Sequence, residues 1–237
     1  MLFEYTKCKK CNHLNPAYKN ICSECKSYLR ERVVNIDLWN TIQLIIEDPY
    51  KAFKQIIFSE HKNFTVFITF FIVIKNLLIS RFLSVPELGI NGVTTSFILS
   101  FVLMILITLV LSSSFVLIQK SLYTKKEIVL RFSDIYAVNS YSFIPYLFGL
   151  VFIFPVELVV LGGDIFSNNP YSFEIKPFIS YILIGFELIT IIWSFFLIQK
   201  SILALSANRS YSIIITSAYF ISWSAVLFFS SKIVFSI

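Results

Sequence analysis

Long apolar segments separated by short polar connections dominate the chain from residue 64 onward. A hydrocarbon layer about 30 Å thick requires roughly 20 apolar residues per helix, and five stretches of this chain meet that length. The hydrophobic pattern therefore predicts five membrane-spanning helices. Their approximate bounds are 64–82, 94–118, 136–161, 178–199 and 211–235.

Proline, glycine, paired asparagines and charged residues interrupt these apolar segments. Proline and glycine interrupt helices, and charged side chains avoid hydrocarbon. We therefore expect connections between consecutive helices at these interruptions. They lie in residues 84–89, 123–126, 162–170 and 207–210.

The composition supports a membrane protein and argues against a soluble enzyme. Of 237 residues, 57% are hydrophobic and only 14% are charged, and the mean hydropathy is +0.77. Soluble domains carry about 25% charged residues. The 26 Phe and 12 Tyr exceed what one water-facing domain buries, whereas lipid-facing helices accommodate Phe and membrane interfaces accommodate Tyr. The expected fold class is an all-α integral membrane protein with a small N-terminal metal module.

That module is indicated by two Cys-x-x-Cys pairs, Cys8 with Cys11 and Cys22 with Cys25. Two residues between cysteines let both thiolates face one ion, and two such pairs complete a tetrahedral, structural Zn²⁺ site with no open position. His13 is then not needed as a ligand. The alternative is disulfide bonding, which we weight lower because the distribution of positive charge places this segment in the reducing cytosol.

Residues 5–29 resemble the short zinc-ribbon modules at the N-termini of many prokaryotic membrane proteins. The resemblance rests on the cysteine pairs, the Asn-Pro between them and Leu29 after the second pair. Such modules usually carry glycine after each pair, where this chain has Asn12 and Lys26. The position needs a left-handed backbone, which Asn tolerates better than Lys. In so small a module, metal binding would supply most of the folding free energy.

Lysine and arginine are concentrated on one side of the predicted topology. Sixteen lie on the side of the N-terminus, ten of them in residues 1–63, against three on the opposite side. The positive-inside rule places the N-terminus in the cytosol and the C-terminus outside. Topology and attraction to anionic lipid then explain the net charge of +6. Nucleic-acid binding by the basic ribbon is an alternative that we weight lower, because its lysines are equally typical of a solvated surface.

A segment of intermediate polarity connects the ribbon to the membrane domain. Asp48 followed by Pro49 is typical of a helix N-cap and first helical residue. Tyr50, Phe53 and Ile57 then share one helix face, which predicts a short amphipathic helix in the headgroup region. A soluble linker helix is the alternative. The expected domains are the cytosolic zinc ribbon in residues 1–32, this linker in 33–63 and the membrane domain in 64–237.

The membrane domain resembles the Yip family, five-span membrane proteins named for interaction with Ypt/Rab GTPases. The resemblance covers residues 40–237 and rests on three features: the Pro-x-x-Ala-Phe segment at 49–53, the polar run with a proline at 132–146, and the short polar loop at 199–210. It implies a role in membrane organisation or vesicle traffic through partner proteins. For ribbon-bearing prokaryotic members it implies no agreed activity.

Three ionisable residues fall within the predicted spans: Lys75, Glu157 and Glu187. Such residues are costly in hydrocarbon and indicate a function or a partner. Lys75 and Glu187 lie at similar depths, so we expect them to pair, as a static contact or as part of an ion pathway. Glu157 is expected near the headgroups. Asn139 belongs to a polar run that predicts hydrogen bonds between helices, chiefly for packing.

These features favour a non-enzymatic adaptor or scaffold, whose ribbon and loops recruit a protein partner to a prokaryotic inner or plasma membrane. The sequence contains no Gly-rich phosphate loop, GxSxG or HExxH motif, so we do not expect an enzyme. The main alternative is a small transporter that uses the polar residues around Lys75 and Glu187. An intramembrane enzyme is a weaker alternative, and homo-oligomerisation stays open.

Overall fold

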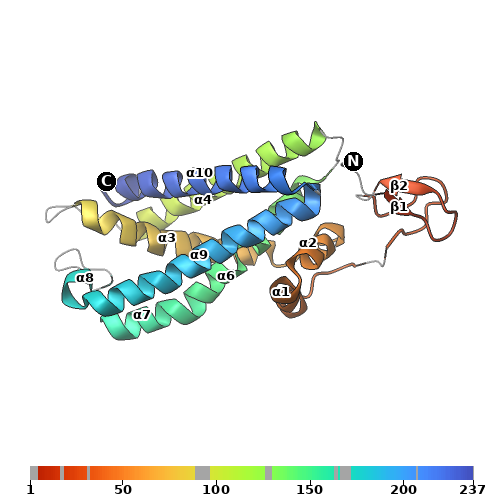
Figure 1. Cartoon of the computed structure of the whole chain (residues 1–237). Coiled ribbons are helices and arrows are strands. Elements are labelled where there is room, and N and C mark those ends of the chain that lie inside the picture. The colour runs from red at the N-terminus through yellow and green to blue at the C-terminus, as the bar shows by residue number, and fades with distance from the viewer. Residues whose placement is uncertain are drawn as a thin grey trace.

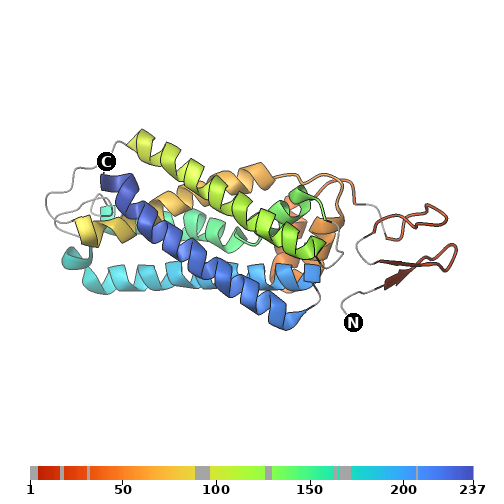
Figure 2. The same cartoon turned by 90° about the horizontal axis from the view of Figure 1, so that it is seen from above.

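Most helices of this computed structural model lie side by side in one elongated bundle, and the N-terminal module stands beyond one end of it (Figure 1). Helix α10 packs against α3, α4 and α9, and Figure 2 shows it running across the bundle from the end where the C-terminus lies. The structure describes residues 5–16, 19–30, 33–88, 97–125, 130–162, 165, 172–206 and 208–236.

Four helical segments are long and apolar enough to cross a membrane, which confirms the expected class of helical membrane protein. Five spans are not confirmed. Helix α3 (Thr65–Leu88) contributes a shorter apolar run, Thr65–Ser80. The four segments are Ile98–Thr124 of α4 (Phe97–Thr124), Ile144–Leu161 in the third predicted span, Pro177–Ser206 of α9 (Pro177–Ser206) and Arg209–Ser231 of α10 (Arg209–Ser236).

Helical structure extends into two of the predicted connections. Helix α3 continues through residues 84–88, and α4 continues through Thr124. Hydropathy locates the part of a helix that suits hydrocarbon, whereas the backbone hydrogen bonds of a helix extend into the polar layer beyond it. Proline at position 86 removes one such bond, which membrane helices tolerate. Most of the third connection lies outside the described residues, and a short helix, α8 (Ser172–Ile175), follows it.

The third predicted span begins earlier than expected and is interrupted. Ser142 donates hydrogen bonds from its N–H to the carbonyls of both Val138 and Asn139, at 3.1 and 3.2 Å, and the helix turns here. Pro145 explains the interruption, because it has no N–H to donate to the carbonyl of Tyr141 four residues earlier and its ring would clash with that carbonyl in a continuous helix. The successive elements are α5 (Phe132–Tyr141), α6 (Ile144–Phe148), a π-helix η1 (Gly149–Ile153) and α7 (Phe154–Leu161).

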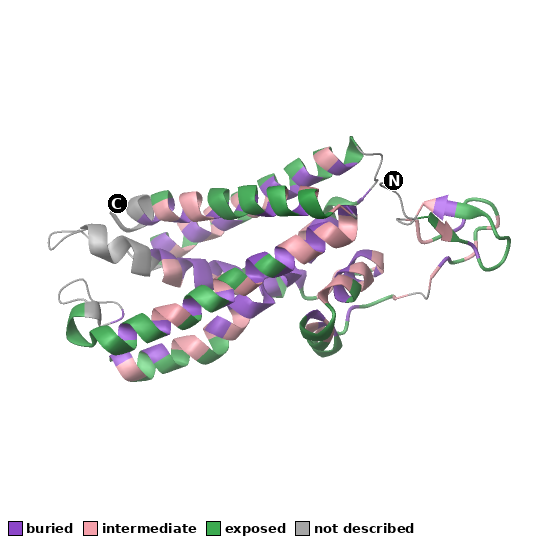
Figure 3. Ribbon diagram, in the orientation of Figure 1, coloured by how far each residue is buried: buried purple, intermediate pink, exposed green. Residues whose placement is uncertain are grey.

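Aromatic side chains fill the centre of the bundle. Phe115 of α4 and Tyr219 of α10 stack with ring centroids 3.7 Å apart, and Phe195 of α9 meets Trp223 of α10 edge to face at 5.4 Å. Outward faces are apolar as well: Val159, for example, is 85% exposed. Figure 3 shows buried residues between the helices and exposed residues along their outer faces. Exposed apolar side chains on outer faces are what lipid contact requires.

Two short helices, α1 (Leu38–Glu47) and α2 (Pro49–Phe58), precede α3. The predicted N-cap of α2 is confirmed, because the Asp48 carboxylate accepts from the Lys51 N–H at 3.1 Å and Pro49 is the first helical residue. Helix α1 was not predicted. The apolar face of α2 buries Phe53 and Ile57, and α2 packs against α5 and α9. This face therefore contacts protein, whereas the sequence predicted contact with headgroups.

Lys62 joins the end of α2 to the start of α5. Its ammonium donates to the carbonyls of Ile57 and Ser59 at 2.8 and 2.9 Å, and it lies 3.1 Å from a carboxylate oxygen of Asp134. Arg131 also contacts that carboxylate, at 3.0 Å. Burial lowers the pKa of Lys62, and the charge of Asp134 opposes this change. The contact fixes the two short helices on the membrane bundle.

Replacing Asp134 by asparagine is expected to destabilise the protein by about 2 kcal/mol, because Lys62 stays largely buried without its counter-charge. Replacing Arg131 by glutamine, the matched control, is expected to cost less than about 1 kcal/mol, since the Arg131 side chain is 61% exposed. Denaturant titration of the detergent-solubilised protein measures both changes. Equal effects of the two substitutions would show that burial of Lys62 is not the cause.

Candidate metal centre and buried ion pair

The two cysteine pairs form two turns of matching geometry. In the first, the Cys8 N–H donates to the carbonyl of His13 at 2.9 Å, and the Asn12 N–H donates to the carbonyl of Cys8 at 3.0 Å. The corresponding bonds in the second turn, donated by the N–H groups of Cys22 and Lys26, are 2.9 and 3.1 Å long. The first turn joins the antiparallel strands β1 (Tyr5–Lys7) and β2 (Leu14–Pro16).

These turns bring the four cysteine sulfurs within 4.8 Å of one another. Cys8 and Cys25 lie 3.6 Å apart at sulfur, Cys11 and Cys22 lie 3.5 Å apart, and all four thiols are free. A tetrahedral ion with metal–sulfur bonds of about 2.3 Å needs sulfurs separated by about 3.8 Å. The donor set therefore fits a single tetrahedral metal ion. His13 is exposed and is not part of this group.

Hydrogen-bond donors surround the sulfurs. The Lys10 N–H and the Asn15 side-chain amide donate to Cys8 and Cys22 respectively, each at 3.4 Å. The Ser27 hydroxyl, followed by the N–H groups of Cys11 and Lys10, lowers the pKa of Cys8 to about 5. Such donors stabilise thiolate, the form that binds metal.

Asn15 is a member of this centre that the sequence interpretation did not identify as one. It is fully buried, and besides its bond to the Cys22 sulfur it accepts from the Ser23 N–H at 2.8 Å. It thereby joins β2 to the second cysteine turn. An asparagine between two cysteine pairs in a polar segment was the signal that could have identified it, because a buried amide needs several partners.

The backbone after each cysteine pair is left-handed, as the sequence predicted: φ is +58° at Asn12 and +54° at Lys26. A side chain with a β-carbon costs about 1–2 kcal/mol there, and glycine avoids this cost. Replacing Lys26 by glycine is therefore expected to stabilise the ribbon by about 1 kcal/mol. Asn12→Gly, the control, should change the stability of the ribbon by less, because Asn tolerates this conformation. Competition with a metal chelator measures the metal affinity of both variants. A lower metal affinity of Lys26→Gly than of the wild type would contradict the prediction.

A second group of polar side chains lies inside the bundle. Lys75 of α3 and Glu187 of α9, expected to pair, form an ion pair, with residue exposures of 2% and 7%. Gly149 of the π-helix makes room for it, because a β-carbon there would lie 3.3 Å from both the Lys75 ammonium and the Thr190 hydroxyl. A buried charge pair is stable only when geometry and neighbouring polar groups compensate for desolvation.

Asn76, next to Lys75, extends this polar group and was missed in the sequence. Its amide donates to the Thr108 hydroxyl at 3.1 Å, and its oxygen accepts from the Tyr146 hydroxyl at 3.0 Å. It thus connects α3 to α4 and α6. Its position beside a lysine in an apolar segment was the available signal, since polar residues in membrane helices face other helices.

Asn139 of α5 belongs to a different part of the bundle. Its amide donates to the Gln119 side chain of α4 at 3.1 Å. Asn139 also lines a small cavity of about 10 Å³ with polar neighbours that include Tyr136 and Ser140. That volume is about the space that one water molecule needs. The residue therefore joins α5 to α4, in the packing role expected from its sequence.

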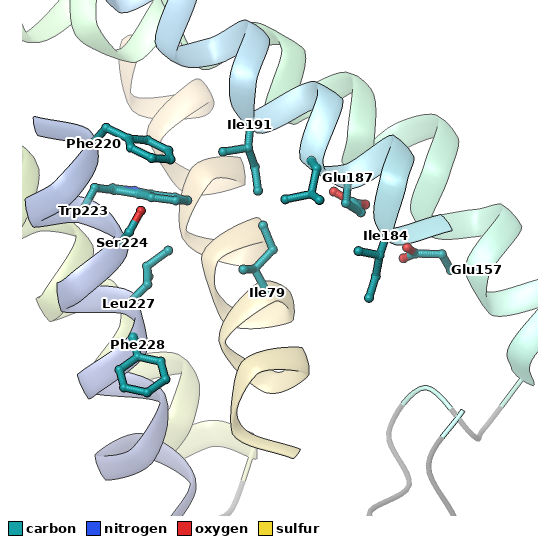
Figure 4. A pocket seen from close by; sticks show the side chains of 11 residues that line it. Ile79, Glu157, Ile184, Glu187, Ile191, Phe220, Trp223, Ser224, Leu227 and Phe228 are labelled. Atoms are coloured by element: carbon teal, nitrogen blue, oxygen red, sulfur yellow. The ribbon is translucent and has the colours of Figure 1, made fainter. Parts of the chain in front are cut away.

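Glu157 of α7 was expected near the headgroups, where it would be solvated. It is instead buried in the bundle, with a residue exposure of 2%. Together with Glu187 it lines a cavity of about 390 Å³ between α3, α7, α9 and α10, shown in Figure 4. Oxygen Oε2 of each carboxylate has no hydrogen-bond donor among the described residues. The structure thus brings together three of the four predicted polar residues, Lys75, Glu157 and Glu187, and leaves Asn139 apart.

The chain therefore contains two arrangements with distinct chemistry: a four-sulfur site for one ion, and a charge cluster enclosed by apolar helices. The first stabilises a small module, and the second holds charge away from water. No protein-family model, curated protein or solved structure matches the chain, so the assignment of function rests on these residues.

Proposed function

We propose that this protein is a multi-span membrane adaptor, in which a zinc ribbon on the cytosolic side recruits a protein partner. The observation that carries the proposal is the position of the ribbon beyond the end of the bundle, where its surface is free for contact (Figure 1). A metal-stabilised module of this size offers a rigid surface at little cost in chain length. The proposal assigns no reaction to the protein.

The β-hairpin of the ribbon supplies a suitable surface. Pairing of Tyr5 with Pro16 and of Lys7 with Leu14 places these four side chains on one face, since paired residues point to the same side. Tyr5 and Leu14 are 61% and 60% exposed. Asn15, on the other face, is buried against the cysteines. An exposed face with an aromatic, an aliphatic and a basic residue suits a protein partner with apolar and acidic groups.

The ribbon is attached at the base of the membrane domain. The N–H groups of Glu60 and His61 donate to the carbonyls of Val33 and Val34, both at 3.0 Å. Arg30 lies over the ring of Phe58, 3.9 Å from its centroid. These contacts join Arg30 and the segment that follows the ribbon to the residues that precede α3, which supports a role at the membrane surface.

The proposal includes zinc as the bound ion, α3 as a fifth span, a cytosolic N-terminus and membership of the Yip family. Helix α3 has 24 residues, which at about 1.5 Å each extend about 36 Å, more than the hydrocarbon thickness of about 30 Å. A reporter fused after Ile237 tests the topology. Activity of that reporter in the cytosol would contradict an odd number of spans with the N-terminus inside.

Affinity capture from native membranes tests recruitment. We expect a reproducible protein partner that is lost from Cys22→Ser, which cannot hold metal, and also from Leu14→Glu, which keeps the metal but alters the exposed face. Ile46→Ser on α1 is the matched control, an exposed apolar residue outside the ribbon, and should retain the partner. Retention of the partner by Leu14→Glu, or captured nucleic acid in its place, would contradict recruitment through this face.

A small transporter is the second candidate, and the buried ion pair of Lys75 and Glu187 favours it. Charges inside a membrane bundle often mark the path of an ion or substrate. Uptake or current measured in vesicles with purified protein tests this candidate. Substrate-dependent flux that Glu187→Gln abolishes would support it over the adaptor.

A further inference from the structure

The cavity of about 390 Å³ beside Glu157 and Glu187 has the volume and the kind of lining residues that are expected of a ligand site. Small-molecule pockets occupy about 300–1,000 Å³ and combine apolar walls with a few polar groups. Here the walls include Ile79, Ile191 and Leu227, and the two carboxylates are the charged groups. Figure 4 shows the carboxylates on one side of the cavity and Phe220 and Trp223 on the other.

When both carboxylates are ionised, the charges of this cluster do not balance. Lys75 contributes one positive charge and contacts one oxygen of Glu187, whereas Glu157 and Glu187 contribute two negative charges when ionised. Oxygen Oε2 of each carboxylate is buried and accepts no hydrogen bond from the described residues. Glu157 is only 2% exposed, and its side chain points toward Glu187 and Ile184 (Figure 4). A buried, unpartnered carboxylate oxygen is costly, so the site lacks a hydrogen-bond donor for these two oxygens, and a cationic donor would satisfy them best.

We propose that this cavity binds an amphiphilic amine, a molecule with a single ammonium group on an apolar chain. The ammonium lies between the free oxygens of Glu157 and Glu187 and supplies the missing charge and donors. The chain occupies the apolar part of the cavity along Ile79 and Leu227. Trp223, which is 4% exposed and lines the same cavity, adds an aromatic surface of the kind that attracts cations and alkyl chains.

The site lies away from the ribbon. Helix α7, which carries Glu157, lies toward the end of the bundle opposite the N-terminal module (Figure 1). Binding in this cavity therefore depends neither on the cysteine site nor on a cytosolic partner. It also requires no transport. Amine binding can therefore fail while the adaptor proposal stands, and the adaptor proposal can fail while amine binding stands.

Titration with octylamine tests the proposal, because its amine is protonated at neutral pH. The chain has three Trp, so Trp39→Phe and Trp193→Phe together leave Trp223, which lines the cavity, as the only tryptophan, and excitation at a wavelength that tyrosine does not absorb reports on it alone. We expect a saturable change of Trp223 fluorescence with octylamine in full-length protein held in lipid nanodiscs. Octanol and octanoate, with the same chain but no cation, should bind at least tenfold more weakly.

Two variants in this background locate the site. Glu157→Gln removes the unpartnered charge without changing side-chain shape and should raise the Kd for octylamine at least tenfold, which corresponds to about 1.4 kcal/mol. Ser224→Leu fills part of the cavity without changing charge and should also weaken binding. Glu174→Gln, an exposed carboxylate on α8, is the matched control and should bind as the parent does.

Three results would overturn the inference. Octanol binding as tightly as octylamine would show that the cavity selects only an apolar chain. Octanoate binding more tightly than octylamine would show that the cavity favours an anionic ligand over a cationic one. An unchanged Kd for octylamine in Glu157→Gln would show that the Glu157 carboxylate does not bind the amine. An unchanged Kd in Ser224→Leu would place the amine elsewhere on the protein or in the surrounding lipid.

Discussion

Replacing Cys22 by serine is expected to abolish stoichiometric zinc binding and to unfold the ribbon, while the membrane bundle stays folded. Cys22 is 1% exposed and belongs to the small apolar core of the module with Cys8 and Leu29. Structural zinc contributes about 10–16 kcal/mol to modules of this kind, and so small a core does not replace it. Elemental analysis of the purified protein measures the metal, and limited proteolysis measures unfolding of the ribbon.

Ser23→Ala is the matched control for this experiment. Ser23 is adjacent and exposed, and the hydrogen bond that it makes to Asn15 comes from its backbone N–H, which alanine keeps. The control should hold one zinc per chain. Stoichiometric zinc in Cys22→Ser would contradict the four-sulfur site. Iron as the native metal, or oxidised thiols in metal-free wild-type protein, would contradict the choice of zinc.

Replacing Lys75 by methionine is expected to destabilise the bundle by about 3–5 kcal/mol. The substitution leaves Glu187 buried without its partner, in a cavity that already contains Glu157. Breaking a buried ion pair costs this much because the remaining charge is uncompensated. Unfolding of the solubilised protein in sodium dodecyl sulfate, followed by tryptophan fluorescence, measures the change.

The double variant Lys75→Met, Glu187→Met is expected to recover most of that stability, because apolar side chains of similar volume replace a buried pair with little loss. The difference between the single and double variants measures the coupling of the two residues. Lys51→Met is the control, an exposed lysine on α2. A double variant as unstable as the single one would show that Lys75 and Glu187 act independently.

The apolar helices and the cysteine turns could be predicted because each depends on local pattern. A run of about 20 apolar residues has few stable conformations other than a membrane helix. The cysteine spacing likewise restricts the ribbon, and the left-handed backbone at Asn12 and Lys26 followed from the glycine expected there. The depth argument brought Lys75 and Glu187 together because helix rise is nearly constant.

Features that depend on tertiary packing could not be predicted in this way. Burial of Glu157 is set by the positions of α3, α9 and α10 around it, which no spacing within α7 reveals. The apolar face of α2 was recognised, but hydropathy does not distinguish contact with α5 and α9 from contact with lipid. The π-helix at Gly149–Ile153 was likewise not predicted, and its Gly149 leaves space for the ammonium of Lys75, a contact that only the packed bundle reveals.

The pairing of Val33 and Val34 with Glu60 and His61 determines how mechanical load passes through this protein. It closes the chain that contains α1 and α2 into a loop, so a pull on the ribbon bypasses both helices. Tension reaches the first residues of α3 through two backbone hydrogen bonds and the contact of Arg30 with Phe58. A pull on the ribbon would thus act on the start of α3 before either short helix began to unfold.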